Sequence, residues 1–209
     1  MIEKINTEGY ETISKPSENV ITYLEKLLSD NEKPITVAEI GVGVGATSVE
    51  IVKRLRECDS FYFFSYDWEV EELNDDLKDA DWCKCKLYPV GNSTKTYDSY
   101  NWPLSKLCLE GNVSFDLAYL DGGHTLFCSG LGAVLLKKLI KPEGILIFDD
   151  VFWTQQHLDP SVHDKVLEGY TLEQFETPQI KMVIDLFMED DEDWERQGDI
   201  EWQTVYKKK

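Results

Sequence analysis

Short apolar runs alternate with amphipathic stretches along most of the chain, and this alternation predicts strands followed by helices. Compact apolar or aromatic runs predict buried strands at residues 35–39, 61–66, 86–90, 115–120 and 145–148. Apolar positions at helical spacing predict helices at residues 16–28, 47–56, 131–140 and 179–188. Strands that alternate with helices favour a parallel sheet with helices on both faces.

Local signals refine the ends of these elements. Pro89 lacks a backbone N–H, so the third strand is expected at a sheet edge or to end there. Lys-Pro-Glu-Gly at residues 141–144 is expected to end a helix. Gly198 and Asp199 separate two strand-like runs and predict the turn of an antiparallel hairpin. The expected fold is therefore α/β, with a doubly wound, mostly parallel seven-stranded sheet that this C-terminal hairpin completes.

The length of 209 residues fits a single domain with a sizeable core. Within it we expect a helical segment over residues 1–30 and a substrate-side insertion over residues 152–171. No apolar run is long enough to span a bilayer, and the N-terminus lacks the pattern of a secretory signal. A cytoplasmic location is therefore expected, with the five cysteines as reduced thiols.

A formal net charge of −19 at pH 7 limits the partners that the chain can bind. Nucleic acids and anionic membrane surfaces are disfavoured, because binding to them depends on patches of Lys and Arg. A small molecule is the expected partner. Aromatic residues around Trp102 or Trp194 would suit a homodimer contact.

Three glycines at alternate positions follow the first strand: Gly41, Gly43 and Gly45. The order of strand, glycine turn and helix start lets the backbone approach a ligand that a Cβ would exclude. The free N–H groups of the helix start would face a polar group of that ligand. The segment therefore predicts a nucleotide-like ligand.

Glu39 helps to choose between two such ligands. Gly41, Gly43 and Ala46 loosely satisfy the dinucleotide fingerprint, so the glycines alone do not decide. A carboxylate two residues before the first glycine fits poorly beside a pyrophosphate and suits a ligand with an ammonium group. Further acids and small polar residues follow the other strands, without Lys or Arg: Asp67, Gly91, Asn92, Ser93, Asp121, Asp149 and Asp150.

Three motifs in this order resemble those of class I S-adenosylmethionine-dependent methyltransferases. The first is the glycine turn with its preceding Glu39. Asp-Leu-Ala-Tyr-Leu-Asp-Gly-Gly-His at residues 116–124 resembles the fourth-strand signature of a small-molecule O-methyltransferase branch. Residues 141–150, which end in Asp149 and Asp150, resemble the segment that follows in that branch. The resemblance covers most of the chain and implies a Rossmann-like methyltransferase fold.

The resemblance also implies roles for individual residues. The glycine turn would hold the methionine and ribose part of S-adenosylmethionine, with Glu39 at the amino-acid end. Asp67 would bind the ribose hydroxyls, and Asn92 and Ser93 would lie near the adenine.

Asp121, Asp149 and Asp150 end neighbouring strands, and three carboxylates need a cation or raised pKa values to share a cleft. Oxygen ligands suit Mg²⁺. The arrangement resembles catechol and macrolide-sugar O-methyltransferases, in which matching acids bind a divalent metal. The catechol enzyme has Asn where this chain has Asp150, so the sugar enzymes resemble it more closely. We expect Asp121 to take part in catalysis, and His124 to act as a base or to orient the substrate.

The leading hypothesis is metal-assisted methyl transfer to a hydroxyl of a small molecule, in particular a sugar or glycoside. Three alternatives stay open. The first is a methyltransferase that needs no metal or uses another acceptor. The second is an NAD-type oxidoreductase, and the third is a binding module that senses the cofactor without turnover.

Overall fold

The computed structural model describes residues 15–92 and 99–209. Within them seven strands form one sheet, in the order β3-β2-β1-β4-β5-β7-β6. Strands β1 to β5 pair in parallel, and β7 is antiparallel to both β5 and β6. The bounds are β1 Thr36–Ile40, β2 Ser60–Tyr66, β3 Lys86–Asn92, β4 Phe115–Leu120, β5 Ile140–Phe148, β6 Trp194–Ile200 and β7 Gln203–Lys208. The predicted fold class is confirmed, as is the edge position of the strand that holds Pro89.

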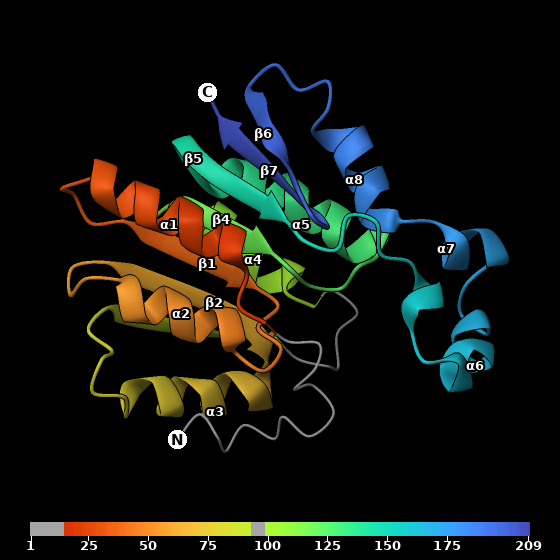
Figure 1. The fold of residues 1–209 in the computed structure, drawn as a ribbon, viewed down its shortest axis with the longest axis horizontal. Helices are drawn as coiled ribbons and strands as arrows, with labels where there is room; N and C mark the ends of the chain where they lie inside the picture. Colours follow the sequence, from red (N-terminus) through yellow and green to blue (C-terminus); the bar gives the residue numbers. More distant parts are fainter. Residues whose placement is uncertain (1–14, 93–98) are drawn as a thin grey trace.

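Helices cover both faces of the sheet (Figure 1). One face carries α1 (Glu18–Asp30), α2 (Ala46–Arg54) and α3 (Asp67–Lys78). The other carries α4 (Asn101–Glu110), α5 (Leu126–Leu139) and α8 (Gln179–Phe187). Short helical segments fill the connection from β5 to α8, where the insertion was predicted, and α6 and α7 stand away from the sheet in Figure 1. They are η2 (Gln155–His157), η3 (Pro160–Val162), α6 (His163–Leu167) and α7 (Leu172–Glu176).

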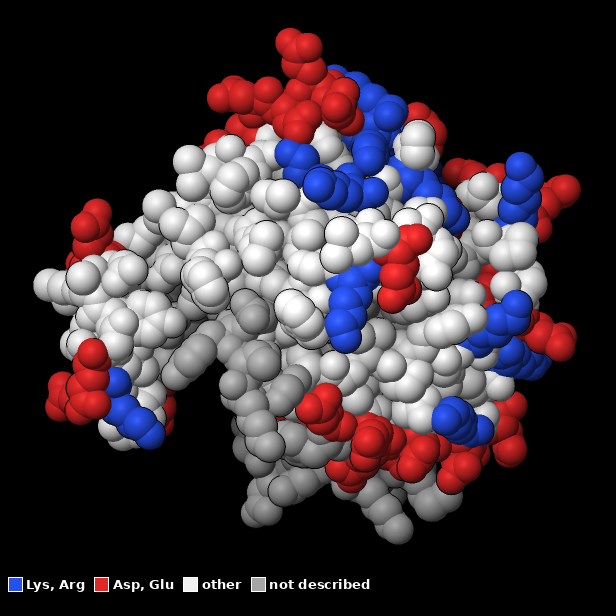
Figure 2. Space-filling view, turned by 180° about the vertical axis from the view of Figure 1, so that it is seen from behind, with Lys and Arg blue, Asp and Glu red and all other residues white. Residues whose placement is uncertain are grey.

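The surface reflects the composition. On the face shown in Figure 2, acidic side chains gather along the upper and lower margins, and Lys and Arg lie between them. No helix of the described residues is both long and apolar enough to cross a membrane. All five cysteines are free thiols.

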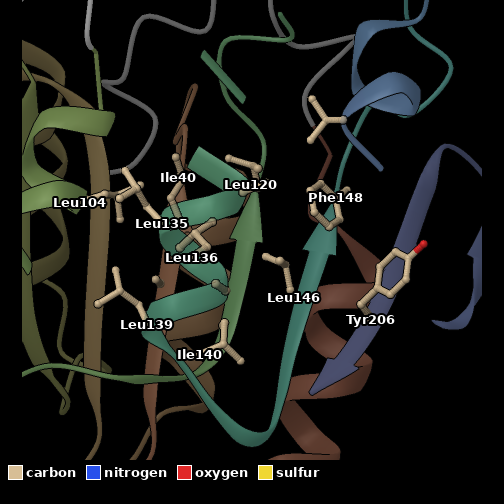
Figure 3. Packing of buried hydrophobic residues seen from close by; sticks show 14 of the residues in the cluster. Ile40, Leu104, Leu120, Leu135, Leu136, Leu139, Ile140, Leu146, Phe148 and Tyr206 are labelled. Atoms are coloured by element: carbon tan, nitrogen blue, oxygen red, sulfur yellow. The ribbon is translucent and has the colours of Figure 1, made fainter. Parts of the chain in front are cut away.

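The pleat of the strands divides the core into two layers. In β4, Ala118 and Leu120 face the layer under α4, α5 and α8, and Leu117 and Tyr119 face the layer under α1, α2 and α3. Figure 3 shows part of the first layer, in which Phe148 of β5 lies edge-on to Tyr206 of β7 with 6.1 Å between ring centroids. Because both faces of β5 are covered at residues 145–148, this part of the strand is continuously apolar, as predicted.

Several boundaries differ from the prediction. Helices α3 and α4 were not predicted. Strand β5 begins at Ile140, which pairs with Phe115, so residues 140–144 extend the strand instead of ending the helix. Its first residue is also the C-cap of α5, which leaves no loop between the two elements.

The hairpin also differs from the prediction in its turn. The turn lies at Glu201 and Trp202, between β6 and β7. Gly198 lies inside β6, where the pairing register shifts, and takes the positive φ that this irregularity requires. Trp194 is buried against the core, so of the two tryptophans expected at a dimer contact only Trp102 is exposed.

A candidate active site at the carboxyl edge of the sheet

The glycine turn lies where β1 and β4 end side by side. Gly41 has a φ of +89°, and a Cβ there would lie 1.9 Å from the backbone oxygen of Asp121. Only glycine lets the two strand ends approach this closely. Gly43 and Gly45 also have positive φ, and Gly45 is the N-cap of α2. The predicted strand, turn and helix start are therefore confirmed.

A cavity of about 260 Å³ lies against this turn. Gly41 and Gly43 form one wall, and Gly122 and Gly123 of the loop after β4 form another. Asn92, predicted near the adenine, also lines the cavity, whereas Ser93 lies outside the described residues. None of the described lining residues is a Lys or Arg.

The acid nearest this cavity is one that sequence reasoning missed. Asp67, predicted to bind ribose, is exposed and lies over Gly91, where a Cβ would come within 2.3 Å of its Oδ1 atom. Glu69 lines the cavity and accepts a hydrogen bond from the Ser65 hydroxyl. Because α3 begins directly after β2, the third residue of that helix reaches the cavity. Since α3 was not predicted from the sequence, the position of Glu69 could not be expected either.

Tyr100 is a second lining residue that the sequence did not indicate. Its hydroxyl donates a hydrogen bond of 2.8 Å to the Gly122 carbonyl oxygen, and its ring lies against Gly132 of α5. The side chain is almost fully buried. It therefore helps to fix the loop after β4.

Glu39 lies buried at the end of β1, with 1% of its surface exposed. It accepts a hydrogen bond from the Ser48 hydroxyl of α2. Burial raises the pKa of Glu39 to about 8; the bond from Ser48 opposes the shift, and the charge of Asp121 adds to it. A nearby cationic group would lower this pKa and favour the charged carboxylate.

Asp121, His124 and Asp150 come together at the same edge of the sheet. The His124 Nε2 atom lies 3.5 Å from Asp121 Oδ1 and 3.3 Å from Asp150 Oδ2. His124 and Asp150 both adopt positive φ, which places these side chains on tight turns after β4 and β5. Burial raises the pKa of Asp121 to about 6; the nearby imidazole opposes this shift, and Asp149 adds to it.

This cluster fits a divalent cation. The Nε2 atom of His124 is buried and has no hydrogen-bond partner with good geometry in the described structure. One donor atom from each residue lies within 4.8 Å of the others. Two carboxylates and an imidazole match the preference of divalent metals, and the imidazole favours Mn²⁺ or another transition metal more than an all-oxygen set would.

Asp149, predicted as a metal ligand, lies next to this cluster but is not one of its three residues. It accepts hydrogen bonds from the Tyr119 hydroxyl and from the backbone N–H of Asp150. Gln203 fixes the direction of the first bond. Its Oε1 accepts from Ser17 and Asn19, so its Nε2 donates to the Tyr119 oxygen at 3.3 Å. The phenol proton is then left for a carboxylate.

Comparison with known proteins adds to this geometry. No protein-family model and no curated protein sequence matches the chain. Solved structures match over nearly its whole length. The O-methyltransferase from Bacillus cereus in complex with S-adenosylhomocysteine has a TM-score of 0.65 and 13% identity, over 100% of this chain and 89% of that one.

Two further structures show how broad the likeness is. The O-methyltransferase TomG of Streptomyces achromogenes, involved in tomaymycin synthesis and bound to S-adenosylmethionine, matches with a TM-score of 0.65 and 13% identity, over 99% of this chain and 88% of that one. The carbon methyltransferase CurJ matches with a TM-score of 0.55 and 16% identity, over 92% of this chain and 55% of that one. The chain has the fold of class I S-adenosylmethionine-dependent methyltransferases. Because that fold serves oxygen and carbon acceptors, the acceptor has to be argued from the site.

Proposed function

We propose that this chain is a methyltransferase that uses S-adenosylmethionine to methylate a hydroxyl of a small molecule, a sugar or glycoside, with the help of a divalent cation. The observation that carries the proposal is the loop of residues 121–124. Asp121 and His124 belong to the carboxylate–imidazole cluster, and Gly122 and Gly123 line the cavity beside the glycine turn. One loop thus joins a donor site to a cation site.

The cavity beside the glycine turn is the proposed donor site. When bound, S-adenosylmethionine supplies an electrophilic methyl group on a sulfonium. The turn at Gly41, Gly43 and Gly45 gives backbone access, and Glu39 favours the ammonium end of the donor. Asn92 and Ser93 are assigned to the adenine. Glu69 lines the cavity, so we assign the ribose hydroxyls to it together with Asp67. Related folds hold S-adenosylmethionine or S-adenosylhomocysteine, which supports this assignment.

Asp121, His124 and Asp150 are the proposed cation ligands, with His124 in the place first expected for Asp149. Mg²⁺ or Mn²⁺ bound there would lower the pKa of an acceptor hydroxyl and fix its direction. Asp121 and Asp150 supply the negative charge, and Tyr119 holds Asp149 beside them. Acidic residues at the mouth of the sheet also disfavour a pyrophosphate.

A second candidate is transfer without a metal. The observation that favours it is the position of His124 Nε2 between two carboxylate oxygens. In this reading Nε2 accepts the proton of the acceptor hydroxyl, and Asp121 and Asp150 stabilise the resulting imidazolium. The NAD-type alternative finds no support in the topology, because β7 is antiparallel and lies between β5 and β6.

Calorimetry and Mn²⁺ binding followed by electron paramagnetic resonance test the proposal. We expect the wild-type chain to bind S-adenosylhomocysteine and Mn²⁺. Asp121→Asn should weaken Mn²⁺ binding by about tenfold or more and leave S-adenosylhomocysteine affinity within about twofold, because one ligand is lost at nearly constant shape. Asp164→Asn, an exposed position in α6, is the matched control.

Each outcome is decisive for one part of the proposal. Absence of S-adenosylhomocysteine binding would reject methyl transfer. Equal Mn²⁺ affinity in Asp121→Asn and the wild type would reject the cation site. Methyl transfer that survives chelation would favour the second candidate, in which His124→Ala should still abolish turnover.

A further inference from the structure

A second and larger cavity, of about 590 Å³, is lined by Tyr119, whose hydroxyl also donates a hydrogen bond to Asp121 of the carboxylate–imidazole cluster. It opens between the start of α1 and the turn that joins β6 to β7. Tyr119 and Asp149 form its inner wall, and Asp149 is the chain neighbour of the cluster residue Asp150. Its volume falls within the range of small-molecule sites. The cavity is thus large enough for an acceptor and ends beside the cluster.

The charge around this cavity is one-sided. Its described lining residues include three carboxylates, from Glu18, Asp149 and Glu201, and one ammonium group, from Lys15. Neither Glu18 nor Glu201 forms a salt bridge with any described residue. Among the described residues, these two carboxylates flank the mouth without an ion-pair partner, and Lys15 is the one basic residue in the described lining. An anionic ligand would be repelled there, and a cationic one would be attracted.

An aromatic wall runs from the cluster to this cavity. The ring of His124 lies edge-on to Trp153 at 5.0 Å, Trp153 stacks on His157 at 6.3 Å, and His157 lies edge-on to Trp202 at 5.2 Å between ring centroids. Trp202 lines the cavity, and 42% of its surface is exposed. An exposed indole next to carboxylates suits the face of a ring and, through its π-electrons, a positive charge.

The inner wall offers the hydrogen-bonding groups that hydroxyls require. Asn19 and Gln203 line the cavity with amide side chains, and Gln203 is already oriented by its bonds to Ser17 and Asn19. Amides can donate to and accept from hydroxyl groups in fixed directions, and carboxylates accept from them. Together, the walls combine an aromatic surface, amides and an excess of negative charge.

We infer that this cavity binds the methyl acceptor and that the acceptor is a hydroxylated ring carrying an ammonium group. The inference rests on the proposed methyl transfer to a small-molecule hydroxyl and adds the charge of the acceptor, while the ring that carries the hydroxyl is left to the test. An amino sugar and a catecholamine both present this chemistry. Phosphorylated sugars and carboxylated or CoA-linked phenols carry the opposite charge and are disfavoured by Glu18 and Glu201.

Matched pairs of probes test the charge preference, titrated into the protein with S-adenosylhomocysteine and Mg²⁺ present. Glucosamine and glucose 6-phosphate place a positive and a negative group on the same kind of sugar ring. Dopamine and caffeate do the same on a catechol ring. In at least one pair the ammonium member should bind about tenfold more tightly, as expected for two surface carboxylates acting on opposite charges. The pair that shows binding identifies the ring.

Substitutions locate the preference in the cavity. Glu201→Gln should reduce the preference about threefold, and Glu18→Gln should act in the same direction. Trp202→Ala should weaken the binding of the ammonium-bearing probe by about fivefold, because the ring contact and the cation–π attraction are lost. Glu192→Gln removes the same charge next to the start of β6, at the opposite edge of the sheet, and should leave the preference unchanged.

Three results would overturn the inference. They are tighter binding of the anionic members, a preference that survives in both Glu201→Gln and Glu18→Gln, or no binding of any probe while S-adenosylhomocysteine binds normally. The last result would leave the proposed function intact and reject only this acceptor class. Failure of S-adenosylhomocysteine to bind would instead reject the proposed function.

Discussion

At the scale of single residues, one missing Cβ determines how the site is assembled. Gly41 allows the end of β1 to lie against the backbone of Asp121, and this contact brings the donor cavity and the cluster to one place. The three glycines of the turn are therefore not equivalent. Gly43 has open space around the position of a Cβ, whereas Gly41 has backbone atoms there.

This difference predicts unequal effects of alanine. Gly41→Ala should destabilise the fold by about 3 kcal/mol or more, because the methyl group meets backbone that cannot move aside at a position of positive φ. Gly43→Ala should cost only about 1 kcal/mol, from its φ alone. Chemical denaturation of the two variants measures both. Equal losses would show that the contact with Asp121 does not govern the turn.

The sequence could indicate most residues of the candidate site, because strand ends of a parallel sheet meet at one edge. The glycine turn, Asn92, Asp121, His124 and Asp150 all lie there. The hydrogen-bond partner of Asp149 could not be predicted. It is Tyr119 of β4, which is oriented by Gln203 of β7, and the two residues meet only in the folded sheet.

At the scale of elements, the buried apolar strands could be predicted from the sequence. Helix α3 and the turn of the C-terminal hairpin could not. Strands β1, β2 and β4 agree with their predicted positions within one residue, because burial on both faces leaves little choice of side chain. Helix α3 is rich in acids, and its stripe of Val70, Leu73 and Leu77 is narrow. In the hairpin, a glycine at a bulge resembled a turn, while the true turn uses Glu201 with positive φ.

One connection between elements depends on an ion pair whose carboxylate is buried. Asp59, fully buried before β2, accepts hydrogen bonds from the backbone N–H groups of Ile35 and Arg56 and from the Arg56 guanidinium. Arg56 also donates to the carbonyl oxygens of Asn31 and Lys33. Burial raises the pKa of Asp59, but these donors outweigh it and hold the pKa below its usual value. The pair thus ties the loop before β2 to the loop before β1.

Asp59→Asn should destabilise the protein by about 2 kcal/mol, because a buried charge partner is lost and Arg56 is left without its carboxylate. A folded-state pKa below the unfolded value stabilises the protein above about pH 4, and this contribution disappears as the pH falls through the folded pKa. The difference in melting temperature between wild type and variant should therefore narrow in acid. Glu57→Gln, exposed in the same loop, is the control. A difference that does not depend on pH would contradict this account.

At the scale of the whole molecule, the charge of −19 acts on stability as well as on the choice of partner. Acidic groups along the margins seen in Figure 2 repel one another across the surface. Counter-ions reduce this repulsion over a distance of about 10 Å at 0.1 M salt. Added salt should therefore stabilise the folded state more than the expanded unfolded chain, in which the charges lie farther apart.

Raising NaCl from about 10 to about 200 mM should increase the melting temperature by a few degrees, through screening of this repulsion. KCl at equal ionic strength should give the same increase, since screening does not distinguish the two cations. Differential scanning fluorimetry measures both series. A melting temperature that stays constant or falls with salt would show that surface repulsion does not limit stability.

The loop of residues 121–124 borders both the donor cavity and the carboxylate–imidazole cluster. Two ligands that share a structural element are linked thermodynamically. By whatever factor the donor changes the affinity for the cation, the cation changes the affinity for the donor by the same factor. Affinities measured for either ligand alone therefore describe only half of a reciprocal equilibrium, and the order in which the two ligands bind cannot alter the final balance.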